Sequence, residues 1–348
     1  MAISINDLKA ELQGFFTDGL AVIVGSGLSV AEGIPGMGAL EAHLDKTIPP
    51  LVSGQDLKCW QEIAVNLAAK KGLEAALLAT KATEPLEEKI IAVTVALIEC
   101  AEKKVIAEVI EGKRELPLSL LLPHLNPQPN RALPVITTNY DRLVEIAAET
   151  IGWGVDCMFV GHCVGTLDSA MATRSFIKDF KIARKGLAIS YRNRICIAKP
   201  HGSLDWFRHT KGPLRTSIPV DLPRLVITPG GSKYQKGYSI PFDRHRENGN
   251  TAIDAAARLL VLGYGFNDDH LETHLSQNLR QGKPCLILTH QVTENGMKAL
   301  AESPNAIALS HDPKNSNGVI CTRGKTQTSY DGGSIWSVKS FVEKVLTP

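Results

Sequence analysis

The segment AVIVGSGLSVAEGIP, residues 21–35, decides how the fold begins. An apolar run, Ala21 to Val24, leads into a loop that contains Gly25, Gly27 and Gly33. A short apolar run of this kind indicates a buried strand, and glycines directly after it let the backbone approach a diphosphate where the next helix begins. The spacing is not the usual GxGxxG, and glycines at such a turn are about as often structural. The residues alone therefore predict a strand followed by a candidate nucleotide-binding loop.

The alternation of strands and helices continues along the chain. Further short apolar runs end in Gly, Pro or polar turns, and helical patterns follow several of them; the runs lie at 133–137, 195–198, 259–262, 285–288 and 307–309, and the helical patterns at 141–150, 268–279 and 293–301. Such alternation is typical of βαβ units. We therefore expect an α/β fold with a doubly wound, mainly parallel, Rossmann-like sheet.

Two segments depart from this pattern. Residues 39–122 contain long helical stretches at 60–79 and 87–110 without a convincing strand, which predicts a helical subdomain inserted after the first βα turn. Residues 161–194 are mixed in character and basic towards their end, and we expect a surface excursion there. We expect residues 1–348 to form a single domain that carries the helical insertion.

The composition is that of a folded enzyme in a reducing compartment. Hydrophobic residues make up 44% and charged residues 21%, and Lys plus Arg exceed Asp plus Glu by only two, which argues against direct nucleic-acid binding. The seven cysteines are scattered and form no CxxC pair. The N-terminal stretch has no long apolar run. We therefore expect a cytoplasmic protein that does not insert into a membrane.

Three more polar segments follow expected strands, so their side chains should emerge at the carboxyl edge of the sheet, where ligands bind. TTNYD, residues 137–141, contains Asn139 and Asp141, for which a helix cap is an equally good interpretation. KPHGSL, residues 199–204, contains His201, and a lone histidine is more often a satisfied surface or core residue than a catalyst. GYGFND, residues 263–268, is also explained by a tight turn with Asp268 as the helix N-cap.

Taken in order, these four elements resemble the sirtuin family. GSGLSVAEGIP resembles the GAGIS signature followed by GIP, TTNYD resembles TQNID, His201-Gly202 resembles the HG element, and GYGFND resembles a G-Y-S-F-x-D turn of bacterial sirtuin-like domains. The resemblance implies NAD as the substrate. It implies that the following residues bind NAD: Gly25, Ser26, Gly27, Ser29, Gly33, Ile34, Pro35, Gly263, Gly265 and Asn267. It also implies that Asn139 places water beside the reacting ribose, Asp141 contacts the nicotinamide carboxamide, and His201 accepts a proton.

The departures from the family pattern bear on the reaction. The first cysteine after His201 is Cys285, so the spacing does not allow a four-cysteine zinc site, and we expect no bound metal. An FGE-type peptide-binding segment is absent from the sequence, and Gly36, Met37 and Gly38 replace the aspartate, phenylalanine and arginine that usually follow GIP. We therefore expect NAD hydrolysis to nicotinamide and ADP-ribose. The alternatives are an NAD-dependent protein deacylase, with residues 161–194 supplying a peptide groove, and a non-catalytic NAD- or ADP-ribose-binding assembly subunit.

The combination of features also resembles the sirtuin-like effector domains of bacterial anti-phage systems. That resemblance implies a defence enzyme that depletes NAD, forms a homo-oligomer and has a HerA-type ATPase as a partner. We expect the helical insertion, residues 39–122, to provide the assembly interface.

Overall fold

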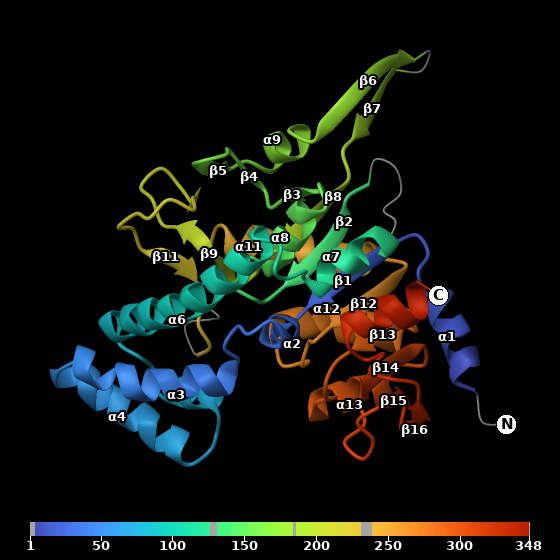
Figure 1. The fold of residues 1–348 in the computed structure, drawn as a ribbon. Coiled ribbons are helices and arrows are strands. Elements are labelled where there is room, and N and C mark those ends of the chain that lie inside the picture. The colour runs from blue at the N-terminus through green and yellow to red at the C-terminus, as the bar shows by residue number, and fades with distance from the viewer. Residues whose placement is uncertain (1–3, 126–130, 184–185, 231–238, 348) are drawn as a thin grey trace.

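The computed structural model describes residues 4–125, 131–183, 186–230 and 239–347. The main strands within these ranges are β1 (Leu20–Val24), β2 (Leu133–Thr137), β3 (Gly154–Asp156), β8 (Arg194–Ala198), β12 (Arg258–Leu262), β13 (Cys285–Leu288), β14 (Ala306–His311), β15 (Gly318–Arg323) and β16 (Thr326–Asp331). They form one sheet in the order β16-β15-β14-β13-β12-β1-β2-β8-β3 (Figure 1). The strands from β14 to β3 run parallel, and the β15-β16 hairpin is antiparallel. The prediction of a mainly parallel α/β fold is confirmed.

Helices cover both faces of this sheet. In β1, Val22 and Val24 pack in one core, whereas Ala21 and Ile23 pack in another, because successive side chains of a strand point to opposite faces. The first core includes residues of α1 (Ile5–Gln13), α7 (Pro117–Leu121), α8 (Leu143–Thr150) and α14 (Val338–Phe341). The second includes residues of α11 (Phe242–Ala255), α12 (Asp269–Arg280) and α13 (Glu294–Ala301). The sheet is therefore doubly wound.

A helical block lies between β1 and β2 in the chain. After α2 (Ser26–Ala31) it comprises α3 (Met37–Thr47), α4 (Gly54–Ala68), α5 (Leu73–Ala79) and α6 (Glu84–Ile110), which share a separate hydrophobic core. The expected helical stretch at 60–79 is two helices, because Lys70 and Gly72 have positive φ angles of 56° and 81° that end α4. The long helix α6 joins the block to the sheet, since its first half packs in the block and its second half packs in the first sheet core.

The segment that was expected only as a surface excursion, residues 161–194, contains short strands, one of which pairs with strands outside it to form a small sheet. A second sheet has the order β11-β9-β10-β5-β4, with β4 (Phe159–Val160), β5 (Gly165–Leu167), β9 (Gly202–Phe207), β10 (Leu214–Arg215) and β11 (Arg224–Val226). After α9 (Ser169–Arg174), β6 (Ile177–Ala183) and β7 (Gly186–Tyr191) form a two-stranded ribbon that projects from the body (Figure 1). Apart from β9, whose six residues are all buried but mix polar with apolar side chains, these strands are short or exposed. They therefore lack the buried apolar runs by which sequence patterns reveal strands.

The order of the main sheet reverses at β1. From β1 the chain adds β2 and β8 on one side, and later adds β12, β13 and β14 on the other. Such a reversal leaves a crevice beside the carboxyl ends of the central strands, where ligands bind in open α/β sheets. The fold therefore locates the candidate site. None of the described helices is both long and apolar enough to cross a membrane.

Candidate active site

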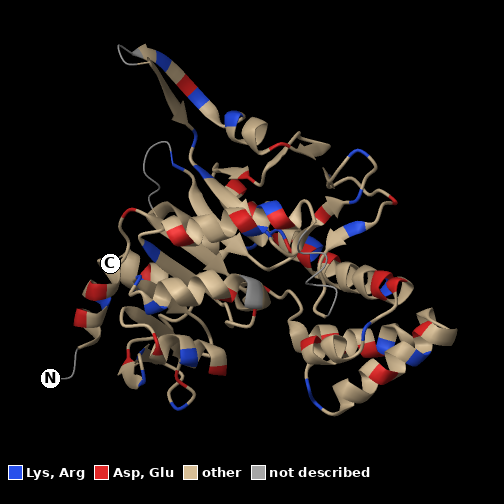
Figure 2. Ribbon diagram, turned by 180° about the vertical axis from the view of Figure 1, so that it is seen from behind, with Lys and Arg blue, Asp and Glu red and all other residues tan. Residues whose placement is uncertain are grey.

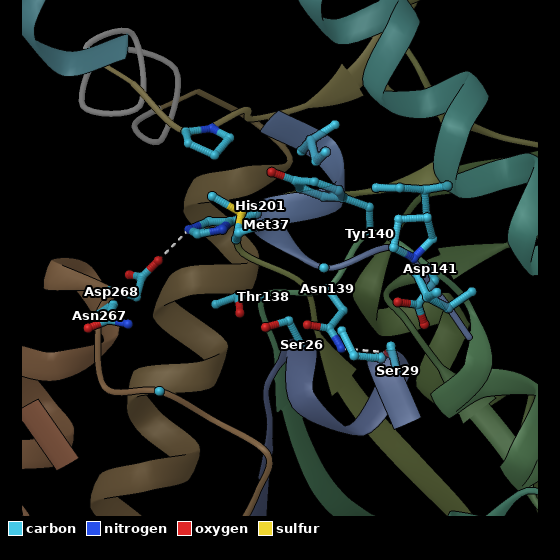
Figure 3. A pocket seen from close by; sticks show the side chains of 18 of the residues that line it. Ser26, Ser29, Met37, Thr138, Asn139, Tyr140, Asp141, His201, Asn267 and Asp268 are labelled. Atoms are coloured by element: carbon cyan, nitrogen blue, oxygen red, sulfur yellow. Dashed lines mark hydrogen bonds and ion pairs between the residues drawn. The ribbon is translucent and has the colours of Figure 1, made fainter. Parts of the chain in front are cut away.

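A cavity of about 220 Å³ lies at the carboxyl edge of the sheet, in the crevice beside β1 (Figure 3). It brings together loops that follow β1, β2, β8 and β12, together with side chains of the helical block. The predicted site residues that line it are Ser26, Ser29, Ile34, Pro35, Asn139, Asp141, His201, Gly265 and Asn267. The predicted residues outside its lining are Gly25, Gly27, Gly33 and Gly263.

Three of these glycines join two loops of the site. A Cβ on Gly25 would lie 2.4 Å from the Tyr264 Cα, and a Cβ on Gly27 would lie 2.8 Å from the Gly263 carbonyl oxygen. Gly263 itself has a φ of +57°, and a Cβ there would lie 2.4 Å from the Leu28 nitrogen. The backbones after β1 and β12 can therefore touch only because all three residues lack side chains. These glycines therefore hold the two loops together behind the cavity and do not line it.

Asn139 is fixed by hydrogen bonds to the loop after β1. Its Nδ2 donates to the Gly25 carbonyl oxygen at 3.0 Å and to the Ser29 hydroxyl at 2.9 Å, while its backbone nitrogen donates to the Thr137 hydroxyl at 3.1 Å. Both amide hydrogens are thus engaged, which leaves the Oδ1 acceptor of this buried side chain for a ligand or water. Asn139 is therefore held in one orientation before any ligand binds.

Asp141 lies beside Asn139, at the point where the chain turns into α8. The carboxylate accepts from the Leu143 nitrogen at 3.2 Å, and the buried Lys199 ammonium donates to the Asp141 carbonyl at 2.5 Å and to Glu145 Oε1 at 2.9 Å. Burial raises the pKa of Asp141, and this rise is opposed by the charge of Lys199 and a hydrogen bond from Ser29. Ser29 therefore interacts with both Asn139 and Asp141.

His201 faces Asp268 across the cavity. Its Nε2 lies 2.7 Å from the Asp268 Oδ2, and both side chains are largely buried (Figure 3). The other carboxylate oxygen of Asp268 accepts from the Leu271 nitrogen at 3.2 Å, so the carboxylate also caps α12. The sequence interpretation identified Asp268 only as a helix cap. The missed signal was its position, directly after the Gly263–Asn267 turn at the same sheet edge as His201.

Gly202 fixes the backbone at His201. Gly202 has a φ of +87°, and a Cβ there would lie 2.1 Å from the Leu225 carbonyl oxygen. The Ile227 nitrogen donates to the His201 carbonyl at 2.9 Å, which ties the histidine to the segment after β11. Glycine after the histidine is therefore a requirement of local packing.

The helical block supplies the opposite wall of the cavity, and sequence analysis placed none of its residues in the site. Met37 and Leu40 come from α3, Glu74 from α5 and Ile98 from α6. Glu74 joins Asp141 and Asp268 as a third carboxylic acid in the lining, and none of the described lining residues is Lys or Arg. This composition favours a ligand group that is apolar or positively charged.

A buried ion pair connects the helical block to the segment that carries Asn139 and Asp141. Glu102 of α6 is fully buried, and its carboxylate accepts from the Arg142 backbone nitrogen at 2.6 Å and from the Arg142 Nη2 at 2.5 Å. Arg142 directly follows Asp141 in the chain. The position of α6 and the position of the Asp141 carboxyl are therefore mechanically linked.

The described residues contain no cluster of three or more His, Cys, Asp or Glu side chains that could hold a metal ion. The seven cysteines are all free thiols. Burial raises the pKa of the Cys157 thiol to about 11, so this thiol stays protonated at neutral pH.

Comparison with known families finds one model that matches part of the chain, and that model describes a SIR2-like domain. The family model for this domain matches residues 134–306, a range that contains Asn139, Asp141, His201 and the loop after β12. No curated protein matches the chain.

Several solved structures are distantly similar in fold. A structure described as "Structural Basis for the Mechanism and Regulation of Sir2 Enzymes" has a TM-score of 0.44 and 11% identity, over 98% of this chain and 99% of that chain. One described as "The Structural basis for Sirtuin Substrate affinity" has a TM-score of 0.40 and 14% identity, over 97% and 95%. One described as "Sir2 bound to acetylated peptide" has a TM-score of 0.37 and 13% identity, over 82% and 87%.

Proposed function

We propose that this chain, with its SIR2-like domain at residues 134–306, binds NAD in the cavity and hydrolyses the bond between nicotinamide and ribose. The observation that carries the proposal is the convergence of Asn139 and Asp141, from the loop after β2, and His201, from the loop after β8, on one cavity at the switch point of the sheet. A pocket with a few convergent polar groups is the ordinary form of a small-molecule site.

The lining supports nicotinamide as the group bound deepest. Nicotinamide in NAD is an apolar ring with a positive charge and one carboxamide, and the described lining offers apolar and acidic side chains. Asp141 lies in the buried part of the cavity, where its carboxyl would hold the carboxamide. A cavity of about 220 Å³ is smaller than a typical cofactor site, so the rest of the dinucleotide would extend out of the cavity along the sheet edge.

The reaction would use the chain's own residues and water. The ribose–nitrogen bond breaks with its electron pair leaving on nicotinamide, through an oxocarbenium-like transition state. Asn139 Oδ1 would orient the water whose oxygen forms the new bond to the ribose carbon. His201 would accept the proton that this water loses, and Asp268 would stabilise the resulting imidazolium. The products are nicotinamide, ADP-ribose and a proton.

Incubation of the full chain with NAD, followed by chromatography of the products, tests this proposal. We expect nicotinamide and ADP-ribose in equal amounts without any peptide. NAD consumption that requires an acetyl-lysine peptide would instead establish a deacylase. NAD that binds but stays intact under both conditions, and also after the chain has assembled with itself or with an ATPase partner, would establish a non-catalytic binding subunit.

The proposed biological role rests on the family resemblance. An NAD hydrolase without restraint would exhaust the cofactor of its own cell, so we infer that the activity is held off until a trigger arrives. An anti-phage effector that is released by assembly with itself or with a HerA-type ATPase would meet this requirement. Turnover measured with and without such an ATPase tests the partner, and rates that are independent of it would contradict the assignment.

A further inference from the structure

The ribbon formed by β6 and β7 is an unusual element for the surface of an enzyme. It projects from α9 and the small sheet, and none of the other described strands pairs with β6 or β7 (Figure 1). A two-stranded ribbon by itself is only marginally stable in water, because it has little apolar surface to bury. The ribbon therefore lacks, within one chain, the packing that would normally stabilise it.

One face of the ribbon is apolar along its described length. Residues that lie opposite each other on paired strands share a face, as do alternate residues of one strand. Phe180 pairs with Ile189, Ile182 pairs with Leu187, and the register shift after Ile177 brings that residue opposite Tyr191. All six therefore lie on one face. The other face carries polar and small residues, namely Asp179, Lys181, Ala188 and Ser190.

This apolar face is open to solvent. The exposed fraction is 90% for Ile182, 63% for Phe180, 57% for Leu187 and 36% for Ile177. Monomeric proteins rarely leave a contiguous apolar surface of this kind uncovered, and an exposed apolar strand edge promotes pairing with another chain. This face is therefore a candidate contact surface for another molecule.

We propose that the ribbon is an arm that docks on a second copy of this chain, with its apolar face packed against the body of the partner. Charge supports this choice of partner. Residues 174–192 contain six of the 38 Lys and Arg residues and one of the 36 Asp and Glu residues. The rest of the chain therefore has 32 basic and 35 acidic residues, so the arm is basic and the body is acidic. Opposite charges favour and orient such a contact.

The apolar area indicates a reciprocal exchange. The four exposed apolar side chains of one arm offer on the order of 400 Å², about half of the roughly 800 Å² that each partner buries in a stable interface. Two arms exchanged across a two-fold axis would double the buried surface, because each copy would give one arm and receive another. The arm thus supplies a homo-oligomer contact outside the helical block that the sequence favoured as the interface.

A matched pair of substitutions tests the proposal by oligomeric state alone. Ile182→Asp places a charge on the apolar face, and Ala188→Asp places the same charge on the opposite face of the same ribbon. Both positions are exposed, so neither change should unfold the protein, which circular dichroism checks. We expect light scattering at about 1 to 100 µM to give a multiple of 37.6 kDa for the wild type and for Ala188→Asp. Ile182→Asp should shift to the monomer mass.

Three results would overturn the proposal. These are a wild-type monomer at every concentration, an Ile182→Asp variant that assembles like the wild type, and an Ala188→Asp variant that falls apart equally. Vesicles of anionic lipid and duplex DNA serve as further probes, since a basic arm with an exposed apolar face also suits those ligands. A monomeric wild type that binds either probe through Ile182 would assign the arm to that ligand and overturn the oligomer. Neither the measurement of oligomeric state nor the binding of the probes depends on NAD cleavage.

Discussion

The two walls of the cavity differ in how their side chains are held. On the sheet-edge wall, Asn139, Asp141 and His201 are fixed by hydrogen bonds and ion pairs to buried neighbours from other loops. The helical wall presents mainly apolar side chains, with Met37 44% exposed at the rim. Groups that act on a transition state need a fixed geometry, whereas groups that only contact the substrate do not. We therefore expect the sheet-edge wall to control the rate of the reaction and the helical wall to control binding.

The helical block and the ribbon, which takes no part in the lining of the cavity, differ in their charge patterns. Blue and red residues are interspersed along the helical block, whereas the ribbon is mainly blue (Figure 2). The buried Glu102–Arg142 pair is a direct polar link from the helical block to the sheet-edge wall. If the helical block moves when the protein assembles, this pair would transmit the movement to Asp141.

The largest expected effect comes from Asn139→Ala. Loss of the amide removes the group that orients water and the hydrogen bonds to Gly25 and Ser29, so kcat for NAD cleavage should fall about 100- to 1000-fold. The measurement is nicotinamide release under saturating NAD. A loss expressed mainly in KM would contradict the assignment of this wall to the reaction rate.

Glu102→Leu removes one partner of the ion pair that links the two walls, and it should lower the free energy of unfolding. It leaves the Arg142 guanidinium without its fully buried carboxylate, which costs about 3 kcal/mol in the free energy of unfolding. Urea denaturation measures this loss. Lys103→Leu, at an exposed position of the same helix, is the control and should change the stability by less than about 0.5 kcal/mol. Equal effects would show that the pair contributes nothing specific.

Asp268→Asn should lower kcat about 10- to 100-fold with little change in KM. The asparagine can still cap α12 through its amide oxygen, but it lacks the charge that stabilises the protonated His201. The ratio of the two kinetic constants is therefore the informative measurement. A wild-type kcat would show that the carboxylate only caps the helix.

Glu74→Gln should raise KM and leave kcat unchanged, which is the opposite of the effect expected for Asp268→Asn. Its carboxylate lies in the helical wall, where it would attract the cationic ring of NAD, so we expect KM to rise a few-fold at low salt with kcat unchanged. High salt should reduce the difference between variant and wild type. A fall in kcat would break the contrast between the two walls.

The smallest expected effect is the contribution of His245 to the pH dependence of the protein's stability. Burial, with a further contribution from the charge of Lys199, lowers the pKa of His245 to about 3. The unfolded chain binds a proton at this residue below about pH 6.5 and the folded chain does not, so stability falls as the pH decreases from about 6.5 towards 3. His245→Asn keeps an acceptor for the Lys199 backbone nitrogen, which lies 3.3 Å from the His245 Nδ1. Thermal unfolding at pH 7 and pH 5 should show a smaller decrease in melting temperature for the variant.

The sequence predicted the central fold because that part of the chain follows periodic rules. Buried parallel strands appear as apolar runs, and the glycines and polar residues after them indicate the carboxyl edge of the sheet. The ribbon and the small sheet were not predicted, since their strands are short or exposed or, in β9, mix polar with apolar residues. Asn139, Asp141 and His201 were found from a resemblance, and the structure places them around one cavity.

The remaining parts of the site depend on contacts between distant segments. The contact of Asp268 with His201 joins residues 67 positions apart, and Glu74 reaches the cavity only through the packing of the helical block. The close approach of Gly25 to Tyr264 is likewise a property of the folded chain. Patterns along the sequence carry no information on such distances, so these residues could be assigned only from the structure.

The most direct test of the central claim compares binding and cleavage of NAD in His201→Ala and in the wild-type protein. Calorimetry should give a dissociation constant for the variant within a few-fold of the wild type, because the cavity and its other polar groups remain. Chromatography should show that nicotinamide release by the variant falls about 100-fold or more, since the general base is gone. A His201→Ala protein that releases nicotinamide at the wild-type rate would contradict the proposed hydrolase site.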